Sequence, residues 1–131
     1  MRLAEEFARE LQRNDFLQLS GEPGAGKTAF VRGLCRRLCP GAAVRSPTYT
    51  VMRDYPCALG GRFYHFDLYR ITSEDDLESV GYYDCDGTIA AEWCENLPEA
   101  LPPRRYVVKL ERTENDHCRR LTVKLVDGEN D

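Results

Sequence analysis

The sequence contains no long apolar run. No hydrophobic stretch approaches the roughly 20 residues that a membrane-spanning helix needs, which argues against a helical membrane protein. Residues 1–6 do not read as a secretory signal either, because they begin an amphipathic helical pattern. We therefore expect a cytoplasmic protein that makes no contact with a membrane.

C-x-x-C cysteine pairs are also missing. The chain has six cysteines, and none of them forms a C-x-x-C pair: Cys35, Cys39, Cys57, Cys85, Cys94 and Cys118. Without a secretory signal, this spacing favours reduced thiols over a disulfide framework, with a zinc site as the minor alternative.

Excess positive charge is lacking as well. The 18 Lys and Arg residues are outnumbered by 22 Asp and Glu residues, which gives a net charge of −4. Strong binding of nucleic acid needs a basic surface that neutralises phosphates. We therefore expect that any nucleic-acid substrate is held by another protein.

Length and composition indicate one globular domain. The chain has 131 residues, of which 42% are hydrophobic and 31% are charged. This length suits one hydrophobic core and is too short for two ordinary domains. We predict a single domain over residues 1–126 and a polar tail at 127–131.

The most informative segment is Gly21-Glu22-Pro23-Gly24-Ala25-Gly26-Lys27-Thr28, which reads G-x-x-x-x-G-K-T, the phosphate-binding P-loop pattern. An apolar run at 16–19 precedes it as a buried strand would. A helical pattern follows, whose apolar face is formed by Phe30, Val31, Leu34, Cys35 and Leu38. Such a loop points backbone N–H groups and the positive end of a helix dipole at a phosphate. Lys27 would reach the β- and γ-phosphates, and the Thr28 hydroxyl would bind Mg²⁺. The flanking strand and helix disfavour the alternative, a glycine-rich turn that binds nothing.

Hydrophobic periodicity and turn residues predict the remaining elements. Along the chain these are a helix at 3–13, an antiparallel β-hairpin at 50–55 and 62–69, a short helix after Ser73, a strand at 88–91, and two strands at 106–110 and 121–126. The first helix would bury a stripe formed by Leu3, Phe7 and Leu11. The strand at 88–91 has small residues, which suit the centre of a parallel sheet.

Two acidic residues, Asp67 and Glu92, come at the ends of predicted strands. Phosphoryl transfer needs Mg²⁺ held by more than one protein oxygen, and a group that orients the attacking water or hydroxyl. Either acid suits these roles, and either is equally well a plain surface carboxylate. Thr48 lies in a loop that suits a sensor of the γ-phosphate, unless its hydroxyl only caps that loop.

The sequence favours adenine over guanine as the base. Asp84-Cys85-Asp86-Gly87 matches the D-x-x-G pattern of GTPases, but no Asn-Lys-x-Asp guanine reader occurs. His65 and His117 lie too far apart in the chain to suggest a metal pair, and His65 is expected to pack in the hairpin. Trp93 is by default a core or interface aromatic. Beside Glu92, it is also a candidate reporter of bound nucleotide.

Four blocks occur in a fixed order: the loop at 21–28, Ser46-Pro47-Thr48-Tyr49-Thr50, His65-Phe66-Asp67-Leu68-Tyr69-Arg70, and Glu92-Trp93. With these blocks the chain resembles the TsaE family over residues 3–126. Members of this family are small bacterial P-loop ATPases needed for threonylcarbamoyladenosine synthesis on tRNA. The second and third blocks are far more specific than the P-loop alone.

The resemblance implies an α/β fold, namely a single-domain, P-loop NTPase-like mixed sheet with an inserted antiparallel hairpin, flanked by helices. It implies that ATP is the ligand and that Thr28 and Glu92 share Mg²⁺. The loop residues that would hold ATP are Glu22, Pro23, Gly24, Ala25, Gly26, Lys27 and Thr28.

Further roles also follow from the resemblance. Thr48 would be a switch threonine and Asp67 the Walker-B-like acid. Trp93 and Arg119 would contact the nucleotide. The catalytic set would then be Lys27, Thr48, Asp67 and Glu92.

The implied partners are the proteins TsaD and TsaB, and tRNA enters only indirectly through their complex. TsaD transfers the threonylcarbamoyl group to tRNA, whereas the ATPase would reset or release the assembly between rounds. Two alternatives stay open on the residues: a small-molecule kinase, and a nucleotide-sensing adaptor that does not hydrolyse.

Overall fold

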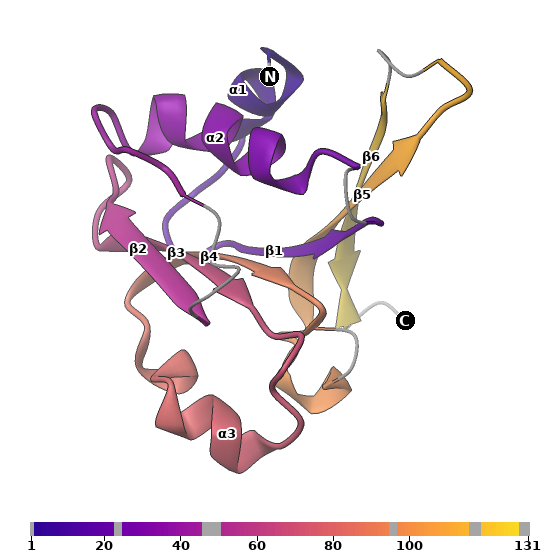
Figure 1. Ribbon diagram of the computed structural model, residues 1–131. Coiled ribbons are helices and arrows are strands. Elements are labelled where there is room, and N and C mark those ends of the chain that lie inside the picture. The colour runs from indigo at the N-terminus through magenta and orange to yellow at the C-terminus, as the bar shows by residue number, and fades with distance from the viewer. Residues whose placement is uncertain (1, 23–24, 46–50, 95–96, 116–118, 129–131) are drawn as a thin grey trace.

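The structure is a computed structural model that describes residues 2–22, 25–45, 51–94, 97–115 and 119–128. One sheet carries helices on both faces. Helices α1 (Arg2–Ala8) and α2 (Lys27–Leu38) cover one face, and α3 (Glu74–Ser79) lies on the opposite side (Figure 1). The described residues also form two short 3-10 turns, η1 (Tyr82–Asp84) and η3 (Pro98–Ala100). The mixed α/β architecture predicted from the sequence is confirmed.

The sheet has six strands in the order β2-β3-β4-β1-β5-β6. Their bounds are β1 Phe16–Ser20, β2 Met52–Pro56, β3 Arg62–Asp67, β4 Gly87–Glu92, β5 Arg104–Arg112 and β6 Arg119–Asp127. Strands β3, β4, β1 and β5 run parallel, and the edge strands β2 and β6 pair antiparallel with their neighbours. The predicted hairpin is therefore β2–β3. The second strand of this hairpin, β3, runs parallel to β4, so β2 is the one strand of the hairpin that runs against the parallel centre of the sheet.

Each face of the sheet packs its own apolar core, because side chains alternate between faces along every strand. Phe63 of β3 belongs to the core beneath α1 and α2, whereas its near neighbour Phe66 belongs to the core on the α3 side. The predicted apolar face of α2 is buried throughout, at Phe30, Val31, Leu34, Cys35 and Leu38. The 3.6-residue period of that segment thus gave the correct buried side of the helix.

Two sequence-based expectations at the chain ends are wrong. Helix α1 ends at Ala8, not at 13, and Leu3 is 58% exposed although it was placed in the buried stripe. The stripe that packs inward runs through Ala4, Phe7, Ala8 and Leu11, at helical spacings of three and four, which leaves Leu3 at its margin. At the other end, Asp127 belongs to β6 and not to the polar tail.

One glycine is required where β4 begins. Gly87 pairs with Arg62 of β3 and has a φ of +150°. A Cβ atom at Gly87 would overlap the backbone of Arg62, which cannot swing aside as a flexible side chain can.

We expect Gly87→Ala to lower the free energy of unfolding by about 3 kcal/mol or more, because backbone strain and overlap act together. Gly41→Ala is the matched control. Gly41 has a φ of +82° but nothing within 4 Å of a Cβ atom, so only strain of about 1 kcal/mol applies. Urea denaturation of both variants measures the difference. Equal midpoints would contradict the close approach of β3 and β4.

Candidate functional site

The candidate site lies at one edge of the sheet, where the parallel strands end. The loop at 21–28 joins the end of β1 to the start of α2. Asp67 ends β3 and Glu92 ends β4, and the two residues are register partners. Glu92 is also paired with Leu19 of β1, just before the loop. The edge formed by the carboxyl ends of parallel strands is where open α/β sheets bind ligands.

The loop begins pressed against β5. Gly21 has a φ of +154°, and a Cβ atom there would stand 2.6 Å from the Leu110 carbonyl oxygen. Gly26 precedes α2 in a left-handed conformation, and its carbonyl accepts the first helical hydrogen bond, from the Phe30 N–H. The described part of the loop thus leads tightly from strand to helix. Pro23 and Gly24 lie outside the described residues.

Lys27, the first residue of α2, turns inward over the end of β4. Its Nζ lies 3.5 Å from Glu92 Oε1, and both side chains are only 10% exposed. The same Nζ stands 5.2 Å from the centroid of the Trp93 ring, a cation–π distance. Three groups predicted from two separate sequence blocks, Lys27, Glu92 and Trp93, therefore meet at the mouth of the loop.

Glu92 is held from its other side by a histidine. Its Oε2 lies 2.6 Å from Nε2 of His65, which is fully buried. Burial alone would raise the pKa of Glu92, but the hydrogen bond with His65 and the charge of Lys27 together hold that pKa below its ordinary value. The Glu92 side chain is therefore a carboxylate at neutral pH.

Sequence reasoning missed this role of His65 and predicted only that it packs in the hairpin. It does lie buried in β3, as expected. One signal was available: His65 stands two residues before Asp67, so both side chains point to the same face of β3. That face also carries the register partner of Asp67, which is Glu92.

Trp93 has an unusual backbone for a bulky residue. Its φ is +63°, in the left-handed region that non-glycine residues rarely adopt. Its ring meets that of Tyr69 edge-on at 5.1 Å, and the Tyr69 side chain is largely exposed. Strain of this kind persists where the surrounding structure holds it, and it concentrates at functional sites.

Asp67 is half-buried and takes part in the turn that follows β3. Its Oδ1 accepts a hydrogen bond of 3.1 Å from the backbone N–H of Tyr69. One oxygen of Asp67 thus stabilises the local turn, and its catalytic role stays a prediction. The position beside Glu92 still brings the two acids to adjacent strand ends.

The other predicted site residues are Thr28, Thr48 and Arg119, and one of them lies outside the described residues. Thr28 lies in the first turn of α2, half-buried. Thr48 falls outside the described residues. Arg119 opens β6 directly opposite Arg112 of β5 and is exposed. Its proposed nucleotide contact stays a prediction.

A hollow of about 480 Å³ adjoins the start of the loop. It is lined by Ser20, Gly21, Glu22, Trp93, Lys109, Leu110, Glu111 and Arg112. Two cationic side chains from the end of β5, Lys109 and Arg112, therefore line the same hollow as the loop and Trp93. Sequence reasoning named neither, because nothing in the pattern of β5 sets these two apart from other strand residues.

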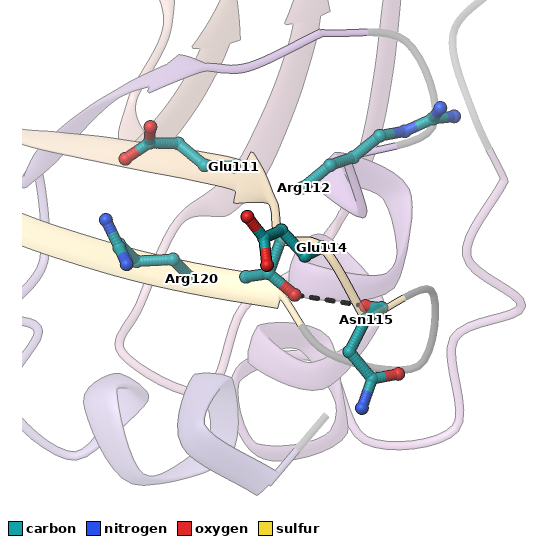
Figure 2. A pocket seen from close by; sticks show the side chains of 6 residues that line it. Glu111, Arg112, Glu114, Asn115 and Arg120 are labelled. Atoms are coloured by element: carbon teal, nitrogen blue, oxygen red, sulfur yellow. Dashed lines mark hydrogen bonds between the residues drawn. The ribbon is translucent and has the colours of Figure 1, made fainter.

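A second hollow, of about 590 Å³, lies at the tip of the β5–β6 hairpin (Figure 2). Glu111 and its register partner Arg120 stand on one side of it, and Arg112 points away from them. The Thr113 hydroxyl donates a hydrogen bond of 3.0 Å to the Asn115 carbonyl, which stabilises the start of the turn. No described residue of the loop at 21–28 lines this hollow, which separates it from the candidate site.

Three other features bear on the sequence-based alternatives. The D-x-x-G segment ends at Gly87, where β4 begins, so it lies at the opposite edge of the sheet from Glu92. The five cysteines in the described residues form no disulfide with one another. In the same residues, no group of three or more His, Cys, Asp or Glu side chains is arranged to hold a metal, and no helix is long and apolar enough to cross a bilayer.

Fold and site together define an α/β protein whose glycine-rich loop joins the sheet to a helix, with a lysine, a glutamate and a histidine gathered at the loop's mouth. Comparison with known proteins places it more closely. The chain belongs to the TsaE family: the family model described as "Threonylcarbamoyl adenosine biosynthesis protein TsaE" matches residues 1–121. The resemblance seen in the sequence motifs is confirmed.

Individual relatives agree with the family match. The chain is 34% identical over 119 residues to the tRNA threonylcarbamoyladenosine biosynthesis protein TsaE of Haemophilus influenzae, covering 85% of this chain and 75% of that protein. The TsaE protein of Aquifex aeolicus is 41% identical over 96 residues, covering 72% and 68%. The crystal structure of Bacillus subtilis YdiB superposes with a TM-score of 0.69 at 26% identity, covering 98% of this chain and 78% of YdiB.

Proposed function

We propose that this protein is a Mg²⁺-dependent ATPase that acts in threonylcarbamoyladenosine synthesis on tRNA. One observation carries the proposal: Lys27 lies against Glu92 at the mouth of a loop with the G-x-x-x-x-G-K-T pattern. A lysine at this place in such a loop pairs with phosphates, and an acid at a neighbouring strand end holds the metal. The names of the family and its relatives support the biological process.

The chemistry of the available donors suits Mg²⁺, which prefers oxygen ligands. Glu92 offers a carboxylate, and its low pKa keeps that group ionised. Thr28 offers a hydroxyl from the first turn of α2. When bound, the metal would neutralise charge on the β- and γ-phosphates. We assign Thr28 and Glu92 as its protein ligands.

Each remaining residue has a role in this proposal. Lys27 would leave Glu92 and pair with the phosphates, while Asp67 orients the attacking water. Trp93, Lys109 and Arg112, which line one hollow beside the loop, would contact the rest of the nucleotide. Thr48 and Arg119 keep their proposed roles as a switch threonine and a nucleotide contact.

Hydrolysis by the isolated protein is expected to be slow. Asp67 already uses one oxygen in a local hydrogen bond, and Lys27 must first leave its ion pair with Glu92. We propose that a complex of TsaD and TsaB in the cytoplasm completes the site. Hydrolysis would then reset or release that complex, which would hold the tRNA, as the net charge of −4 suggests.

The test is capture by immobilised TsaD–TsaB, with and without ATP and Mg²⁺. We expect the wild-type protein to be retained only with ATP, and Lys27→Met to be lost in both conditions. Lys124→Met, which removes an exposed lysine of β6, is the matched control and should behave as the wild type. Retention that is independent of ATP, or absent throughout, would overturn the proposed partnership.

A further inference from the structure

We infer that His65 is a positioning residue whose hydrogen bond fixes the Glu92 carboxylate in the orientation needed to bind Mg²⁺. The inference deepens the proposed function and rests on it for the role of Glu92 as a metal ligand. It assigns to His65 a task that the sequence blocks do not reveal. The histidine itself would touch neither metal nor nucleotide.

The two oxygens of the Glu92 carboxylate have different neighbours. Oε2 lies 2.6 Å from His65 Nε2, a short hydrogen bond, whereas Oε1 lies 3.5 Å from Lys27 Nζ, a looser ion pair. The short bond restrains the position of Oε2 and so limits rotation of the carboxylate. The loose contact leaves Oε1 as the oxygen that faces the loop and is available when Lys27 moves to a phosphate.

His65 is itself held rigidly. It is fully buried in β3, between strands β2 and β4 of the sheet. Rigid secondary structure holds a side chain more accurately than a loop does. The direction of the hydrogen bond that Glu92 receives is therefore set by the pairing of β3 with β4, in which His65 is the register partner of Ala90.

The surroundings of the ring select its tautomer. Nδ1 of His65 is buried and has no hydrogen-bond partner within the part of the chain that the structure describes. The Glu92 carboxylate can only accept hydrogen bonds, so Nε2 of His65 must carry a proton and donate it to Oε2. All of its hydrogen-bonding capacity as a donor serves that one carboxylate.

Loss of the hydrogen bond between His65 and Glu92 should weaken Mg²⁺ affinity more than any other property of the site. Without His65, both carboxylate oxygens are free to turn toward Lys27, which is the remaining charge beside them. The Glu92 carboxylate would then face Lys27 and not the metal. Removing an outer partner of a metal ligand typically weakens metal affinity about 10- to 100-fold.

The experiment uses three variants of the full chain. His65→Leu removes the donor and keeps an apolar side chain of similar bulk. His65→Gln restores an N–H donor near the place of Nε2. Thr88→Val is the matched control, because Thr88 is also a fully buried polar residue, two positions before Ala90 on β4, and its hydroxyl has no hydrogen-bond partner among the described residues.

ATP affinity is measured through the fluorescence of Trp93, the single tryptophan of the chain, across a series of Mg²⁺ concentrations and in EDTA. We expect His65→Leu to raise the Mg²⁺ concentration for half-maximal effect about 10- to 100-fold while ATP affinity in EDTA stays within about threefold. His65→Gln should recover most of the loss, and Thr88→Val should match the wild type. An equal weakening with and without Mg²⁺, or no rescue by glutamine, would reduce His65 to a structural residue.

A second readout needs no nucleotide. In ¹⁵N spectra of the histidine side chains, the His65 ring should carry its proton on Nε2, and this resonance should shift in Glu92→Gln. Its disappearance in His65→Gln assigns it against His117, the other histidine of the chain. A ring without a proton on Nε2, or a resonance unchanged in Glu92→Gln, would overturn the inference. Failure of the wild type to bind ATP would instead contradict the proposed function, and the spectra separate the two cases.

Discussion

Lys27→Met is expected to weaken ATP binding about 100-fold. Nζ of Lys27 is the only ammonium group that the described residues place against Glu92, and the side chain is 10% exposed. A hydrogen bond between a charged donor and a phosphate in such a place is worth up to about 3 kcal/mol, and each 1.4 kcal/mol is roughly tenfold in affinity. Methionine keeps the length and bulk of the side chain. Titration of ATP in the presence of Mg²⁺, followed by calorimetry, measures the loss.

The control separates this effect from loss of general charge. Lys124→Met removes an exposed lysine on β6 and should leave ATP affinity unchanged. Circular dichroism must first show that Lys27→Met is folded, because the substitution leaves Glu92 with His65 as its remaining partner. A folded Lys27→Met that binds ATP as tightly as the wild type would contradict the role of the loop.

Local patterns predicted much of this fold because they concern neighbours in the chain. The apolar period of α2, the alternation of β2 and β3, and the small residues of β4 each specify one element. Parallel pairing then brings the ends of β3 and β4 to one edge, and with them Asp67 and Glu92. The meeting of these two acids near the loop was therefore accessible from the sequence.

The contact between His65 and Glu92 was not accessible in the same way. It depends on the register of β3 against β4, which aligns Asp67 with Glu92 and so places His65 diagonally below it. A register is set by packing over the whole sheet face and by the turn between the strands. A shift by one residue would turn His65 into the other core, and no local pattern excludes that shift.

Conformation at single residues was also beyond the sequence. The positive φ of Trp93 follows directly after β4, and the ring there contacts both Tyr69 and Lys27. The exposed position of Leu3 arises because α1 is oriented by what Phe7 packs against. Phe7 meets Tyr106 of β5 and Phe30 of α2, and these distant contacts fix the rotation of the helix.

Glu92→Gln should separate nucleotide binding from metal binding. Glutamine keeps the shape of the side chain but releases Lys27 from its ion pair. ATP affinity in EDTA should therefore stay equal or rise by up to about tenfold, because Lys27 no longer has to leave a nearly buried ion pair before it meets a phosphate. The gain in affinity on adding Mg²⁺ should vanish, and turnover should fall about 100-fold or more, because a main site of charge stabilisation is lost.

The pH dependence of stability gives an independent check on Glu92. Its pKa is lower in the folded protein than the ordinary value of 4.5. Burial raises this pKa, but His65 and Lys27 lower it by more. Stabilisation by this carboxylate is therefore fully present above the ordinary pKa, and it is lost as pH falls through the lowered folded value. The difference in unfolding free energy between wild type and Glu92→Gln should shrink in that acidic window. A constant difference from neutral to acidic pH would contradict the ion pair.

Asp67→Asn is the matched variant for the metal role of Glu92, because Asp67 ends the neighbouring strand in register with it. If Glu92 holds the metal and Asp67 orients water, Asp67→Asn keeps the gain in affinity on adding Mg²⁺ and loses only turnover. Glu92→Gln loses both. The reverse pattern would exchange the two assignments. A Glu92→Gln protein whose ATP affinity still rises with Mg²⁺ would show that Glu92 is not a metal ligand. That result would be decisive because Glu92 is the carboxylate that lies beside Lys27 at this edge of the sheet.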